Sequence, residues 1–297
     1  MSINAVQFQA GLSMPDFFAA YGTEAKCYRA LYRWRWPQGF RCPCCAGRAR
    51  SRFKRGGAIY YQCSACRHQT SLIAGTMFQG TKLSLRTWML ALHLLTSTKT
   101  NMAALELMRH LGVNYKTAWR MKHKIMQVMA EREATRRLSG FVQIDDAYLG
   151  GERNGGKAGR GSENKQPFLI AVQTDASFTA PSFVVIEPVR SFDNAALTDW
   201  IARRLKPECE AYTDGLACFQ DAGHAHTTLD TGGARWVWCK RHQRRLRRKA
   251  ERYLAEAAYR FNRRFRLPEM LPRLATAMMR CKPCPEPALR MAGNFHG

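Results

Sequence analysis

Two pairs of cysteines near the start of the chain share the same two-residue spacer. Cys42 and Cys45 form the first pair, and Cys63 and Cys66 form the second. The interval between the pairs falls within the roughly 15–20 residues that separate the two halves of a zinc ribbon. Four thiolates presented by two tight turns suit the tetrahedral coordination of Zn²⁺. The spacing therefore predicts a structural zinc site on a hairpin, rather than cysteines that meet by chance in a small core.

The segment between the two pairs has the pattern of that hairpin. It reads ARSRFKRGGAIYYQ, a basic strand and an aromatic strand joined at Gly56 and Gly57. Cys44 lies inside the first pair, so metal binding through Cys44 stays open at this point. Only Cys42 with Cys45, however, repeats the spacer of the second pair.

The remaining cysteines and the termini bear on the cellular compartment. The N-terminal residues lack a basic stretch followed by an apolar segment, and no run of about 18 apolar residues occurs anywhere. We therefore expect a soluble cytoplasmic protein without a membrane partner. In a reducing compartment, eleven cysteines indicate metal ligands plus free thiols rather than disulfides. Cys281 and Cys284 stand alone in a Pro-rich tail, so their spacing favours no second metal site and assigns them no role.

The charge of the chain indicates a polyanionic partner. Lys and Arg number 47 against 22 Asp and Glu, which gives a net charge of +25. Such a balance is typical of proteins that bind nucleic acid and, less often, of proteins that bind acidic membrane surfaces. Nucleic acid is therefore the expected partner.

A helix-turn-helix pattern follows the ribbon. Apolar residues recur at helical spacing, at Met102, Leu105, Met108 and Leu111. Gly112 ends that helix and Asn114 caps the next one, as in a helix-turn-helix. The second helix offers five side chains to phosphates and base edges: Lys116, Thr117, Arg120, Lys122 and Lys124. A plain helical bundle with a solvated basic face would give the same pattern.

After Gly140 the pattern becomes that of an α/β domain. Three strands, an amphipathic helix and a fourth strand follow one another, which predicts a mixed sheet with helices. The first strand ends in Asp145 and Asp146, and the fourth ends in Asp214. If strands one and four are neighbours, Asp145 and Asp214 meet at one edge and can hold Mg²⁺. Two such ions would support hydrolysis of a phosphodiester.

Taken in order, these segments resemble the ISXO-type transposases of bacterial insertion sequences. The resemblance rests on the zinc ribbon and on LGVNYKTAWRMKHKI, IDDAYLGGE, YTDGLACF and RYLAEAAYRFNRRF, and covers nearly the whole chain. It implies a ribonuclease-H-like domain, Mg²⁺ or Mn²⁺ as catalytic cofactor, and transposition by strand cleavage and joining. It also implies that Asp145 and Asp214 are the first two catalytic residues and that Asp146 has a secondary role. The implied partner is double-stranded DNA at the terminal inverted repeats of the element, bound by a homo-oligomer in the nucleoid.

The resemblance fails at the third catalytic residue. The family places an Asn or Glu on a helix after a Trp-Val pair, but here Trp236 and Val237 are followed by the basic segment WCKRHQRRLRRK. Two interpretations stay open. Either Glu251 or Glu256 takes the third position, or an internal deletion has left the site incomplete, and the second is favoured because two carboxylates hold two ions poorly.

The expected organisation has four parts. They are an N-terminal segment over residues 1–80 with the ribbon at about 38–72, a helix-turn-helix over 81–138, the ribonuclease-H-like domain over 139–266, and a helical tail over 267–297. The tail either packs on the core or mediates self-association. The predicted function is that of a transposase of uncertain catalytic competence. The alternatives are a non-catalytic DNA-binding protein or repressor, and a metal-dependent nuclease.

Overall fold

A computed structural model describes residues 10–98, 101–149, 166–213, 226–228 and 250–291. The chain forms two compact units, each considered by itself. The first comprises Met1–Val128 and Phe265–Leu289, and the second comprises Met129–Arg264 and Arg290–Gly297. The four boundaries expected from the sequence stay a prediction. No helix within the described ranges is long and apolar enough to cross a membrane.

The first unit contains the predicted hairpin. Three antiparallel strands lie in the order β1 (Arg50–Arg55), β2 (Ala58–Cys63) and β3 (Gln69–Ser71). The turn between β1 and β2 consists of Gly56 and Gly57, whose φ angles of 54° and 80° are ones that only glycine adopts easily. Aromatic side chains join this sheet to the preceding helix, since the buried ring of Tyr61 packs edge-on against Trp36.

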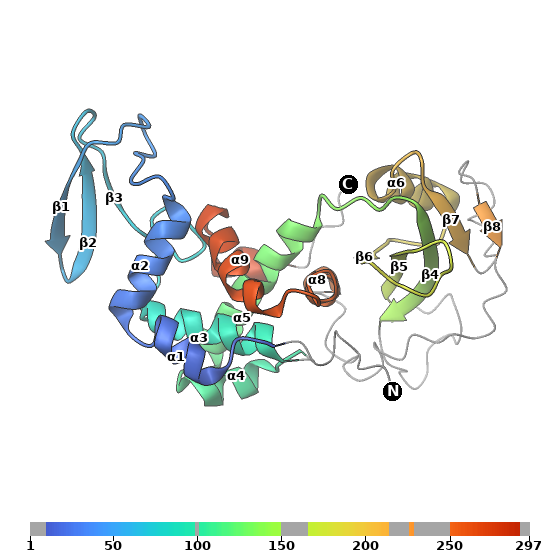
Figure 1. Cartoon of the computed structure of the whole chain (residues 1–297), viewed down its shortest axis with the longest axis horizontal. Helices are drawn as coiled ribbons and strands as arrows, with labels where there is room; N and C mark the ends of the chain where they lie inside the picture. Colours follow the sequence, from blue (N-terminus) through green and yellow to red (C-terminus); the bar gives the residue numbers. More distant parts are fainter. Residues whose placement is uncertain (1–9, 99–100, 150–165, 214–225, 229–249, 292–297) are drawn as a thin grey trace. The chain divides into compact units, whose positions relative to one another are not determined.

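The rest of the first unit is helical (Figure 1). Its helices are α1 (Met14–Tyr21), α2 (Glu24–Arg35), α3 (Leu85–Ser97), α4 (Ala104–Leu111), the start of α5 (Tyr115–Glu133), α9 (Leu267–Arg280) and α10 (Glu286–Arg290). Helix α9 packs on α2 and α3, and the amide of Met77 donates to the carbonyl of Met278 at 3.0 Å. Residues 267–289 of the predicted tail therefore belong to the first unit.

The predicted turn between α4 and α5 is present. Gly112 ends α4 in the left-handed conformation, with φ 63°. The side-chain oxygen of Asn114 accepts a hydrogen bond from the amide of Thr117 at 2.8 Å, which caps the start of α5. The two helices and the turn expected from the sequence are thus present, and the helix-turn-helix assignment stays a prediction.

The second unit contains a mixed five-stranded sheet. Its strands are β4 (Phe141–Leu149), β5 (Gln166–Thr174), β6 (Phe183–Pro188), β7 (Glu210–Thr213) and β8 (His226–Thr228). Their spatial order is β6-β5-β4-β7-β8. β4, β5 and β6 pair antiparallel, whereas β7 lies parallel to β4, and β8 lies parallel to β7. The mixed α/β class expected from the sequence is confirmed, and strands one and four are neighbours as predicted.

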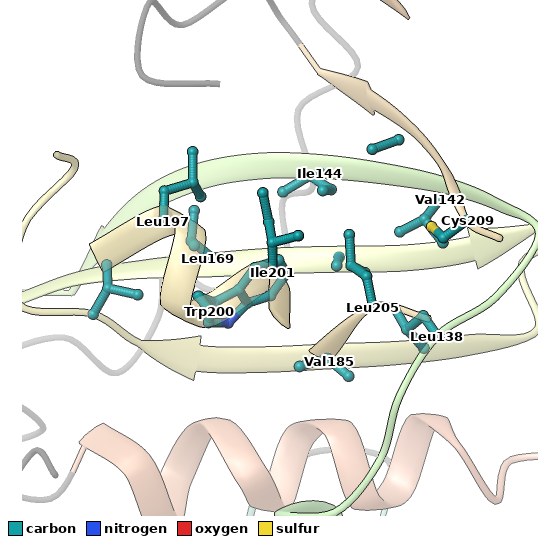
Figure 2. Packing of buried hydrophobic residues seen from close by; sticks show 13 residues of the cluster. Leu138, Val142, Ile144, Leu169, Val185, Leu197, Trp200, Ile201, Leu205 and Cys209 are labelled. Carbon is teal, nitrogen blue, oxygen red and sulfur yellow. The ribbon is translucent and has the colours of Figure 1, made fainter. Parts of the chain in front are cut away.

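Among the described residues, one helix packs on each face of this sheet. On one face, Trp200 and Ile201 of α6 (Asn194–Arg204) pack against Ile144, Leu169 and other buried side chains, as Figure 2 shows. On the other face, Ala250 and Leu254 of α8 (Ala250–Phe261) pack against strand residues that include Phe168 and Leu149. The apolar residues alternate along β4 because successive side chains of a strand point to opposite faces.

Candidate metal and nucleic-acid sites

The four predicted cysteines converge on one point. The Sγ atoms of Cys42, Cys45, Cys63 and Cys66 all lie within 4.8 Å of one another. Two of the separations are 3.6 Å, between Cys42 and Cys66, and 3.5 Å, between Cys45 and Cys63. A tetrahedral zinc site with Zn–S bonds of about 2.3 Å has sulfur atoms about 3.8 Å apart. The cluster therefore has the size and ligand set of a structural zinc site.

The two cysteine pairs lie on matching backbone turns. Ala46 and Arg67 each stand four residues after the first cysteine of their pair, and both adopt positive φ, at 59° and 61°. The amide of Ala46 donates to the carbonyl of Cys42 at 3.0 Å, and the amide of Arg67 donates to that of Cys63 at 3.1 Å. Two turns of the same shape thus present two pairs of sulfur atoms to one ion.

Backbone N–H groups of these turns also change the pKa of a cysteine thiol. Backbone N–H groups of Cys66 and Ala65 lower the pKa of Cys63 to about 7, which favours the thiolate that zinc binds. Cys44 is exposed and is not part of the cluster, although its amide lies 3.4 Å from the sulfur of Cys42. The geometry therefore selects Cys42 over Cys44 as the ligand.

One residue of this site was not anticipated from the sequence. A Cβ atom at Gly47 would lie 3.3 Å from the sulfur atoms of both Cys45 and Cys63. A side chain there would press on two ligands at once, so glycine fits this position. The signal was present in the sequence as a glycine two residues after the first C-x-x-C pair.

The adjacent carboxylates of Asp145 and Asp146 lie on opposite faces of the sheet. Asp145 is paired across the ladder with Ile170, which packs on the α8 side, and Asp146 is paired with Leu169, which packs on the α6 side. Cross-strand partners share a face. Asp145 is exposed and Asp146 is half-buried. The two side chains therefore do not form one site with each other.

The parallel neighbour of β4 is β7, which ends at the residue before the second predicted aspartate, Asp214. The parallel pairing of β4 with β7 ends at Ile144 and Thr213. Asp145 follows Ile144 in the chain and Asp214 follows Thr213. Asp214 lies outside the described residues. Within the described part of the chain, the four cysteines are the one group of three or more His, Cys, Asp or Glu side chains able to hold a metal.

The two glutamates proposed for the third position are both on α8. Glu251 is exposed in the first turn of the helix. Glu256 is 2% exposed, and its Oε1 atom accepts a hydrogen bond from Arg260 at 2.9 Å. Glu256 is thus already engaged in an ion pair within the helix.

The five residues proposed to bind DNA fall into two groups. The ammonium group of Lys122, which is 3% exposed, donates to the carbonyl of Met102 at 2.7 Å, and that of Lys124 donates to the carbonyl of Met77 at 3.0 Å. Burial lowers the pKa of Lys124. These two lysines hold α5 in the first unit, which leaves Lys116, Thr117 and Arg120 as the candidates on the outer side.

An acidic residue next to these candidates was also missed. Glu286, in α10, lies 3.2 Å from the guanidinium of Arg120 and 3.9 Å from the ammonium of Lys116. No sequence pattern connects these positions, because about 170 residues separate them along the chain.

Comparisons with known proteins agree with this arrangement. Residues 137–246 match the family described as ISXO2-like transposase domain, and residues 22–69 match the transposase zinc-ribbon domain. The chain is 25% identical over 210 residues to an uncharacterized protein in transposable element ISH50 of Halobacterium salinarum, covering 66% of this chain and 69% of that protein. No solved structure matches. Asp145 and Asp214 lie inside the matched region, whereas Glu251 and Glu256 lie beyond its end.

Proposed function

Since the chain belongs to the ISXO2-like, IS1595-type transposases, we propose that its second unit is a ribonuclease-H-like domain that cuts and joins DNA strands. The observation that carries this proposal is the parallel pair β4–β7, whose last paired residues, Ile144 and Thr213, are each followed by an aspartate. The strand order β6-β5-β4-β7-β8, with three antiparallel strands followed by two parallel ones, supports the fold that the family resemblance implies.

Asp145 and Asp214 are the proposed metal ligands. Asp145 is an exposed carboxylate on a regular strand, and its hard oxygen atoms suit Mg²⁺ or Mn²⁺. Bound ions of this kind would activate the attacking oxygen and stabilise the leaving one. The proposal is supported by the pairing of the two strands, because β4 carries Asp145 and the paired part of β7 ends at Thr213, the residue before Asp214 in the sequence.

The first unit is proposed to recognise the DNA. Lys116, Thr117 and Arg120 lie at the start of α5, the position from which the second helix of a helix-turn-helix reaches the major groove. The proposed substrate is the pair of terminal inverted repeats of the element, bound by a homo-oligomer on the DNA of the nucleoid. The net charge of +25 supports a large phosphate-contact contribution to affinity.

A second candidate function is a non-catalytic DNA-binding protein derived from a transposase. It is favoured by Glu256, whose carboxylate is buried and paired with Arg260 rather than available to an ion. A metal-dependent nuclease is distinguished from both by cleavage of DNA without strand joining.

The test is cleavage and joining of labelled terminal-repeat DNA with Mg²⁺ or Mn²⁺. We expect Asp145→Asn and Asp214→Asn to abolish cleavage and to leave DNA binding nearly unchanged. Asp146→Asn is the matched control, because its side chain lies on the opposite face of β4 and it should retain cleavage. Equal cleavage by the unchanged chain and Asp145→Asn would overturn the catalytic assignment. Binding without cleavage by the unchanged chain would select the non-catalytic candidate.

A further inference from the structure

The C-terminal segment of the first unit runs along the helix that is proposed to meet DNA. Lys116 and Arg120 are four residues apart and therefore lie on one side of α5. Glu286 contacts both of these cations, Lys116 at 3.9 Å and Arg120 at 3.2 Å. One carboxylate of the C-terminal segment thus lies beside two successive turns of α5.

The contact is held by burial as well as by charge. Leu289, one turn after Glu286 in α10, is fully buried. The preceding helix α9 packs on α2 and α3. The side chain of Glu286 is 21% exposed, whereas those of Lys116 and Arg120 are 63% and 42% exposed. The carboxylate is therefore held in place by the fold, while the two cations keep much of their surface open to solvent.

From this geometry we propose that Glu286 is an autoinhibitory residue, which occupies the two cations of α5 that would otherwise contact DNA phosphates. The inference rests on the proposed role of α5 in DNA binding. A carboxylate between Arg120 and Lys116 competes with phosphate for the same donors and repels an approaching DNA backbone. Productive binding then requires α10 to move away from α5, so the affinity for DNA depends on how firmly this short helix is docked.

The test compares Glu286→Gln with Glu269→Gln in the full-length chain. Both substitutions remove one negative charge from the C-terminal segment of the first unit. Glu269, however, pairs with Arg273 on its own helix, α9. Binding to a short fluorescein-labelled DNA duplex is measured by anisotropy over a range of salt concentrations, and circular dichroism checks that each variant is folded.

We expect Glu286→Gln to bind DNA about two- to ten-fold more tightly at low salt than Glu269→Gln, the range that follows from one or two exposed ion pairs. Its plot of log affinity against log salt should be steeper by about one or two phosphate contacts. Equal affinities of the two variants, or weaker binding by Glu286→Gln, would overturn the proposal.

A third variant separates this inference from the proposed function. Arg120→Ala should weaken DNA binding if α5 contacts DNA. If Arg120→Ala binds as the unchanged chain does, the role of α5 is wrong and the autoinhibitory role of Glu286 is wrong with it. If Arg120→Ala weakens binding but Glu286→Gln does not strengthen it, the DNA-binding role stands and the inhibitory role alone is refuted.

Discussion

The buried carboxylate of Glu133 offers the sharpest test of how the second unit is held together. It stands at the end of α5 and is 8% exposed. It accepts hydrogen bonds from Arg136 at 2.7 Å, from the side-chain amide of Asn262 at 2.7 Å, and from Arg263. Asn262 in turn accepts a hydrogen bond from the amide of Val184 at 2.7 Å. One carboxylate thus connects the end of α5 to the residues after α8 and to the edge strand β6.

We predict that Glu133→Gln destabilises the second unit by about 2–4 kcal/mol. Losing one partner of a fully buried ion pair costs about 3–5 kcal/mol. The estimate is lower here because Arg136 and Arg263 retain some exposure to water, and because glutamine keeps one acceptor oxygen. Urea unfolding followed by circular dichroism measures the loss. Hydrogen exchange in β6 should rise at the same time, since the amide of Val184 depends on Asn262.

The ionisation of the Glu133 carboxylate also makes the stability of the second unit depend on pH. Burial alone would raise the pKa of Glu133, but the charge of Arg263 and the hydrogen bond and charge of Arg136 outweigh it and lower the pKa below its ordinary value of 4.5. A group with a depressed pKa stabilises the fold above its unfolded pKa, and this stability is lost as the pH falls through the folded value. The difference in the free energy of unfolding between the unchanged chain and Glu133→Gln should therefore be constant above pH 4.5 and should shrink below it.

Glu208→Gln is the matched control, because Glu208 is an exposed glutamate of the same unit whose nearest cation, Lys206, is 3.9 Å away. Its substitution should change the stability by less than about 0.5 kcal/mol. Equal stabilities of the two variants would refute the reasoning. So would a rise in hydrogen exchange confined to the first unit.

Two further predictions concern the first unit. Cys45→Ser should lose zinc and unfold the ribbon, whereas Cys44→Ser should bind zinc as the unchanged chain does. The zinc content of each variant is measured by metal analysis after gel filtration. Gly112→Ala should lower the stability by about 1 kcal/mol, because the residue at this position has a positive φ. Gly112→Asn should lower it by less, since asparagine adopts positive φ more easily than alanine. Thermal unfolding compares the two variants, and equal losses would argue against a strained turn.

The parts of the fold that the sequence predicted well are those fixed by local chemistry. Zinc needs four soft ligands in a small volume, so the spacing of the cysteines sufficed to identify all four. A glycine with positive φ at Gly112 and a capping side chain at Asn114 defined the turn before α5. The pattern of strands predicted a mixed sheet with β4 beside β7, because connections between neighbouring elements allow few arrangements.

The parts of the fold that could not be predicted from the sequence depend on contacts between distant segments. Lys122 and Lys124 looked like solvated members of a basic helix, but their ammonium groups donate to the carbonyls of Met102 and Met77. No periodicity within α5 reveals those acceptors. The same holds for Glu286, whose place beside Arg120 follows from the return of the C-terminal helices to the first unit.

The orientation of α8 bears on the missing third ligand. Ala250, Leu254 and Ala258 face the sheet, and a helix turns by about 100° per residue. Glu256 therefore points to the opposite side of the helix from Leu254, away from the sheet that carries Asp145. Glu251 lies three turns before Asn262 on the same side of the helix.

Asn262, just after α8, binds the backbone of β6, the outermost strand of the described sheet. β4 lies two strands further in. Glu256 is therefore directed away from the sheet, whereas Glu251 lies seven residues before Ala258 and so on its sheet-facing side. In the segment from Trp236 to Lys249, which precedes α8, the sequence holds no Asp, Glu or Asn. The two interpretations of the third ligand, a glutamate of α8 or an internal deletion, therefore both stay predictions.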